Sequence, residues 1–86
     1  MEKSRLLSRL SEIDAHIKQP LVELTGCRRV LVENHSGVMA YSQEEITLRM
    51  RYGYLRVVGQ NMILAEMRRE QLVISGQIDG VFIHRG

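Results

Sequence analysis

The stretch from Tyr41 to Gly76 constrains the fold most, because hydrophobic residues recur there at every second position. Three successive runs show this alternation, at 46–50, 55–59 and 62–65, and polar turn residues separate them. Alternate side chains of a strand point to opposite faces, so each run predicts a strand with one apolar face. Turn signals about every eight residues predict that these strands pair as an antiparallel meander.

The alternation continues on both sides of this stretch. It predicts further strands at 22–26, 30–33, 38–41, 72–76 and 78–83. Three of the alternating runs end in a glycine, at Gly26, Gly59 and Gly76, and glycine in a strand pattern marks a bulge or a sharp bend. We therefore expect an all-β domain, a strongly coiled antiparallel meander of about seven or eight short strands. A roll, an open barrel and a small sandwich all fit this pattern.

The pattern changes in residues 1–19, which are predicted to form an N-terminal amphipathic α-helix and a linker. They precede a β-domain over residues 20–86. Leu6, Leu10 and Ile13 recur at spacings of three and four, which gives one apolar stripe along a helix. Pro20 ends the helical passage, because the residue before a proline is pushed toward an extended conformation. We expect this helix to pack on the sheet or over its edge, in preference to inserting into a membrane.

Size and composition narrow the functional classes. A chain of 86 residues forms one small domain, for which association with a partner adds stability. No apolar run reaches the length of a transmembrane helix, so we expect no direct membrane span. Cys27 is the only cysteine, which excludes an intrachain disulfide and favours a reducing compartment, although the sequence indicates no role for it. A cytoplasmic or peripheral protein is expected.

The strongest polar cluster is Glu33, Asn34 and His35. A histidine beside a carboxylate can act as a general base or bind a metal, but one histidine and one glutamate leave a metal underligated. Phosphate-binding loops and zinc patterns are absent from the sequence. We therefore predict no catalytic site, no metal and no cofactor. Instead, Asn34 sets a turn, and His35 hydrogen-bonds across it and holds the neighbouring corner at 42–45.

Basic residues interleaved with an aromatic define a candidate binding face, made of Arg49, Arg51, Tyr54 and Arg56. Such a face on a small β-barrel can stack and bind single-stranded nucleic acid. Neighbouring glutamates and a formal net charge of only +2 weigh against this alternative. A solvated outer face or a protein interface ranks first, and nucleic acid second.

The succession of turns and strands resembles the YabP/YqfC sporulation family over about residues 21–83, and its YqfC-like branch most of all. The more specific part of the resemblance lies in two polar segments. They are Glu33, Asn34, His35 and Gly37 in the first, and Tyr41, Ser42, Glu44 and Glu45 in the second. Both are expected to form one structural corner.

The resemblance implies a small non-enzymatic protein made during endospore formation. It would act in the mother cell, at the forespore outer membrane or the spore coat, with a larger membrane protein of the YqfD type as partner. The residues add a mechanism, because the end strands at 22–26 and 81–83 carry few charges to protect their edges. We expect sheet association with a membrane-anchored partner or with a second copy.

Overall fold

The fold is one antiparallel sheet bent into two layers. The computed structural model describes residues 19–68 and 70–86. The helix expected before Gln19 lies outside these residues. The six strands of the described part are β1 (Leu21–Thr25), β2 (Arg29–Glu33), β3 (Gly37–Tyr41), β4 (Glu45–Met50), β5 (Gly53–Met67) and β6 (Gln71–Arg85). The all-β class and the antiparallel pairing predicted from the sequence are thus confirmed.

Within the described residues the strands number six and not seven or eight, because β5 and β6 are each 15 residues long. The sequence divides each of them at a glycine, Gly59 in β5 and Gly76 in β6. In the structure both strands bend near these glycines, with register shifts between Val58 and Gly59 and between Gln60 and Ile63. The pairing of β5 with β6 continues beyond the bend, so one long strand stands where two short ones were expected.

The expected meander is also only partly right. Strands β3 to β6 follow one another as neighbours, but the order across the sheet is β1-β2-β6-β5-β4-β3. The β1–β2 hairpin therefore pairs with the first half of β6, from Arg29 opposite Ser75 to Glu33 opposite Gln71. The sheet remains open, with β1 at one end and β3 at the other.

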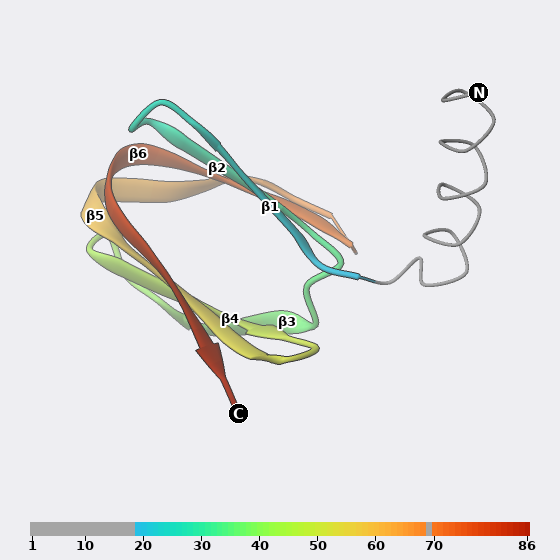
Figure 1. Ribbon diagram of the computed structural model, residues 1–86. Helices are drawn as coiled ribbons and strands as arrows, with labels where there is room; N and C mark the ends of the chain where they lie inside the picture. The colour runs from blue at the N-terminus through green and yellow to red at the C-terminus, as the bar shows by residue number, and fades with distance from the viewer. Residues whose placement is uncertain (1–18, 69) are drawn as a thin grey trace, which may run out of the picture.

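The hydrophobic core lies between the two layers. Figure 1 shows β1 and β2 in one layer and β3 and β4 in the other, with β5 and β6 running through both. The face toward the opposite layer is called the inner face below, and it carries the alternating apolar residues that the sequence predicted. The buried cluster consists of Val30, Val32, Ile46, Leu48, Met50, Leu55, Val57, Met62, Leu72, Ile74 and Ile78.

The bend of the long hairpin requires glycine at two points where backbones approach closely. At Gly76, with a φ of 145°, an added Cβ would lie 2.7 Å from the Asn61 carbonyl oxygen and 2.7 Å from the Met62 Cα. At Gly59 an added Cβ would collide with the Gln77 carbonyl oxygen. Two residues of β5, Asn61 and Met62, stand there opposite Gly76 alone, which makes a bulge that bends the strand. Gly26, by contrast, lies in the β1–β2 turn with a φ of 58°.

Replacing Gly76 by alanine should lower the free energy of unfolding by about 2–4 kcal/mol, because the left-handed backbone and the close β5 backbone both oppose a Cβ. Gly26→Ala is the matched control, since its φ is also positive but no atom lies within 4 Å of the added Cβ. It should cost about 1 kcal/mol. Urea unfolding measures both, and equal losses would contradict a close approach at Gly76.

Tyr52 follows β4 and packs its half-buried ring against the core, where its hydroxyl lies buried without a hydrogen-bond partner. Burial raises the pKa of Tyr52 above its ordinary value of about 10. The unfolded chain therefore loses this proton at lower pH than the folded protein does. Stability should fall as the pH rises above about 10.

Tyr52→Phe should reduce this alkaline loss of stability, because phenylalanine has no proton to release. Urea midpoints at about pH 8 and about pH 10.5 measure the effect. Tyr41→Phe is the control, since the Tyr41 side chain is 52% exposed, and this variant should keep the slope of the unaltered protein. Identical slopes for the two variants would refute the role given to Tyr52.

Candidate functional site

Asn34 organises the turn between β2 and β3. Its φ of 63° lies in the left-handed region, which asparagine tolerates better than most residues do. The Asn34 backbone N–H donates to the Glu70 carbonyl oxygen at 2.6 Å, and its side-chain Nδ2 donates to the Gln19 carbonyl oxygen at 3.0 Å. One residue therefore joins three parts of the chain: the lead into β1, the β2–β3 turn and the β5–β6 turn.

His35 makes a local hydrogen bond in the same turn. Its Nδ1 accepts from the Gly37 backbone N–H at 3.0 Å, so the other ring nitrogen, Nε2, is the one that carries a proton in the neutral ring. That Nε2 is buried without a hydrogen-bond partner. Next to it, the Ser36 N–H donates to the Arg49 carbonyl oxygen at 2.8 Å, which attaches the turn to β4.

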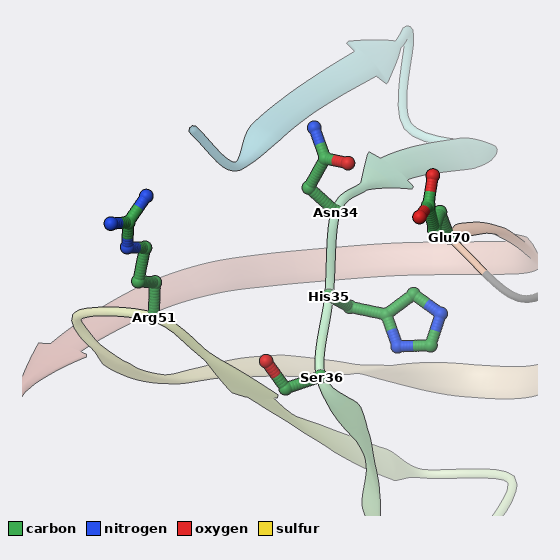
Figure 2. Close-up of a pocket in the computed structure, with 5 residues that line it drawn as sticks. All are labelled: Asn34, His35, Ser36, Arg51 and Glu70. Atoms are coloured by element: carbon green, nitrogen blue, oxygen red, sulfur yellow. The ribbon is translucent and has the colours of Figure 1, made fainter. Parts of the chain in front are cut away.

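A shallow pocket of about 230 Å³ lies beside this turn. Its lining residues are Asn34, His35, Ser36, Arg51 and Glu70. In Figure 2 the Ser36 side chain points toward Arg51, whereas the His35 ring points to the opposite side of the chain. Serine and histidine are therefore not oriented as a nucleophile and its general base, which must lie within hydrogen-bonding distance of each other.

The second polar segment forms the β3–β4 turn. The Ser42 Oγ accepts hydrogen bonds from the backbone N–H groups of Glu44 at 3.2 Å and Glu45 at 3.0 Å. The Ser42 N–H donates to the Glu45 carbonyl oxygen at 2.9 Å and closes the turn. The turn also rests on the bend of β5, because the Glu44 carbonyl oxygen accepts from the Gly59 N–H at 3.0 Å. Serine at this position thus stabilises a turn that supports the bend.

The structure does not bring the two polar segments together into one corner. Glu33 to Gly37 precede β3 and Ser42 to Glu45 follow it, so the two turns lie at opposite ends of this strand, roughly 15 Å apart. His35 accepts its hydrogen bond from Gly37, two residues away, in place of a contact with Ser42. Tyr41, the last residue of β3, is 52% exposed.

Three of the four residues of the candidate basic face share one side of the sheet. Arg49 of β4 stands opposite Tyr54 of β5, and Arg56 follows two residues after Tyr54, so all three lie on the outer face. Arg51 belongs to the β4–β5 turn and lines the pocket instead. The face therefore carries less positive charge than the sequence suggested.

The outer face is held together by contacts that the sequence analysis did not identify. The Arg56 guanidinium lies over the Phe82 ring, 5.2 Å from its centroid, and its Nε contacts the Glu45 Oε2 at 2.8 Å. Tyr54 stacks on His84 with ring centroids 4.4 Å apart. The term outer cluster is used below for Tyr54, Arg56, Phe82 and His84. The register of β5 against β6 creates this cluster, and alternation within one strand does not reveal which strand lies beside it.

The sequence indicates no role for Cys27 and no metal site. Cys27 is an exposed free thiol in the β1–β2 turn. Among the residues that the structure describes, no group of three or more histidine, cysteine, aspartate or glutamate side chains could hold a metal ion.

Asn34→Ala should lower the free energy of unfolding more than Asn34→Gly does, by about 1 kcal/mol. Both variants lose the hydrogen bond to Gln19, but only alanine also opposes the left-handed backbone. Thermal or urea unfolding of the two variants measures the difference. An equal loss would mean that the backbone conformation of Asn34 does not limit this turn.

The comparisons with known proteins cover the strands and both turns described above. The YabP family model matches residues 17–85. The chain is also 29% identical over 77 residues to the protein YqfC of Bacillus subtilis (strain 168), across 87% of this chain and 83% of that protein. No solved structure matches the chain significantly. The resemblance seen in the sequence is thus confirmed, and the chain belongs to the YabP family.

Proposed function

We propose that this protein is a non-enzymatic assembly protein of bacterial endospore formation, which acts by association of its β-sheet with a membrane-anchored partner or with itself. Membership of the YabP family supports the link to spore formation. The partner proposed is a membrane protein of the YqfD type. The place of action is the mother cell, at the forespore outer membrane or the coat.

The observation that carries this proposal is the free edge at β1. Among residues 19–68 and 70–86, only β2 pairs with β1, so within this part the other side of the strand offers unpaired backbone groups. Leu21 and Leu24 are 46% and 53% exposed on it. Natural sheets protect such edges with charges, bulges or a cover, and an unprotected apolar edge is typical of a surface that receives another strand.

Leu24 is notable because it lies on the inner face. It stands opposite Val30, whose side chain is fully buried, and yet its own side chain is half exposed. The opposite layer therefore does not extend far enough to cover the end of the core at β1. A partner that added a strand to β1 would cover Leu24 and extend the core at the same time.

The non-enzymatic part of the proposal is supported by the geometry of the pocket. Its histidine bonds to a backbone N–H, and the neighbouring serine points away from the ring. Within residues 19–68 and 70–86, no helix has the length and apolarity needed to cross a membrane. Attachment to the membrane is assigned to the partner.

The nucleic-acid alternative has less support from the outer face. Of its four residues, Arg51 lies elsewhere, while Arg56 already contacts Glu45 and Phe82. Tyr54, which would stack on a base, already stacks on His84. We therefore retain protein association as the proposed function.

Affinity capture tests this proposal, with the full chain co-produced with the YqfD-type membrane protein of the same organism and solubilised in mild detergent. Leu24→Glu should reduce the captured membrane protein about tenfold, since the added strand would have to desolvate a carboxylate. Ile63→Glu is the control, because Ile63 is 51% exposed but lies on the outer face of β5.

Capture should survive in the control at the level of the unaltered protein. Failure of the unaltered chain to capture the membrane protein would refute the proposed partner. Loss of capture in Ile63→Glu with none in Leu24→Glu would refute the assignment to β1.

A further inference from the structure

A second free edge lies along the C-terminal half of β6. The Ile78 N–H still donates to the Cys27 carbonyl oxygen at 2.7 Å, but from Gly80 to Arg85 β5 is the only strand of the described residues that pairs with β6. In Figure 1 this half of β6 diverges from β2 and crosses toward the C-terminus. Its edge is therefore open along about six residues.

This edge is less protected than the free edges of β3 and of the second half of β5. A register shift between Val38 and Ala40 interrupts β3, and another between Leu64 and Glu66 interrupts the free part of β5. Such bulges discourage pairing. The segment from Gly80 to Arg85 pairs with β5 without a shift, and its first five residues contain no proline and no aspartate, glutamate, lysine or arginine.

We propose that two copies of this chain pair through this edge, antiparallel, with Phe82 of one copy facing Phe82 of the other on a two-fold axis. The inference rests on the proposed function, in which strand edges are the association surfaces, and names a second copy as the occupant of this one. The pairing joins the β3-β4-β5-β6 layers of the two copies into one continuous sheet.

Two charges select both the occupant and the register. Arg85 ends the segment, and Asp79 directly precedes it, at the register shift where it has no partner in β5. With Phe82 on the axis, Asp79 stands opposite Arg85 of the second copy, and the two-fold symmetry forms this pair twice. A shift by two residues would place Arg85 or Asp79 opposite an apolar residue instead. A shift by one residue would set inner side chains against outer ones. Only this register pairs both charges.

The apolar residues agree with the same register. Val81, which packs against the core, stands opposite Ile83, whose side chain is 60% exposed, so the inner face gains a covered pair on each side of the axis. On the outer face, the Phe82 ring covers Gly80, since an added Cβ there would lie 2.8 Å from two ring carbons. His84 of the second copy faces Gly80 and therefore meets this ring. The outer cluster then continues from one copy to the other.

Cysteine cross-linking tests the axis directly, in a Cys27→Ser background of the full chain. Facing Cα atoms of an antiparallel pair lie about 4.5–5.5 Å apart, within the range of a disulfide. Phe82→Cys should therefore form a covalent dimer on mild oxidation. Ile63→Cys is the matched control, since its side chain is 51% exposed against 45% for Phe82, and it should remain a monomer on denaturing gels. The reverse result would overturn the proposal.

Charge exchange tests the register by sedimentation equilibrium. Asp79→Arg and Arg85→Asp should each raise the dimer Kd about tenfold, because like charges then face each other on both sides of the axis. The double variant should restore the original Kd. Glu23→Arg changes the charge of the β1 edge by the same amount and should leave the Kd unchanged.

The outcomes separate this pairing from the proposed function. A monomeric unaltered chain, or a double variant as weak as the single ones, overturns the pairing. If such a monomer still captures the YqfD-type protein, the proposed function stands without it. If the chain dimerises with the expected cross-link but captures nothing, the pairing holds and the proposed partner fails.

Discussion

The close approach of β5 and β6 at their bend is the contact on which the rest of the fold depends. Gly59 and Gly76 let the two backbones come within a distance that a Cβ would not allow, and the bulge at Asn61 and Met62 turns the hairpin there. Each long strand thereby contributes one half to each layer. The first half of β6 receives the β1–β2 hairpin, and the first half of β5 receives β4. Without the bend, the apolar faces of the two halves would not face each other.

The two polar turns, at Asn34 and at Ser42, stabilise the two-layer arrangement through hydrogen bonds to neighbouring parts of the sheet. The Ser42 turn rests on the bend, because its neighbour Glu44 accepts from the Gly59 N–H. Asn34 bonds to Gln19, just before β1, and to Glu70, just before β6. Its turn thereby links the two strands that flank β2 in the β1-β2-β6 layer. The two polar segments that carry the more specific part of the resemblance to the family thus stabilise turns in this chain. Neither turn lies on the open edges of β1 and β6 through which we propose association.

The sequence predicts the parts of this structure that depend on local pattern. Alternation identifies the buried faces, as at Ile46 and Leu48, and the turn chemistry of Asn34 places a left-handed residue correctly. No local sequence pattern indicates which distant strands pair. The pairing of β2 with β6 and the stacking of Tyr54 on His84 therefore could not be predicted. The hydrogen bond that the sequence predicts for His35 across its own turn is made by the Gly37 N–H, but the Ser42 turn, expected beside it, lies at the other end of β3. Arg51 does not lie on the outer face as predicted, because β4 ends at Met50 and Arg51 belongs to the turn that follows.

The pairing of β2 with β6 has a consequence for how the chain folds. The long β5–β6 hairpin forms through contacts near in sequence and can begin at its own turn, where the Arg68 N–H donates to the Gln71 carbonyl oxygen at 2.7 Å. Docking of β2 closes a loop that contains β3, β4 and β5, which is entropically slower. The β1–β2 hairpin is therefore expected to join last, on a template that the bent hairpin has already built. During synthesis β1 and β2 leave the ribosome before β6, and yet they would be the last of these strands to pair in the sheet.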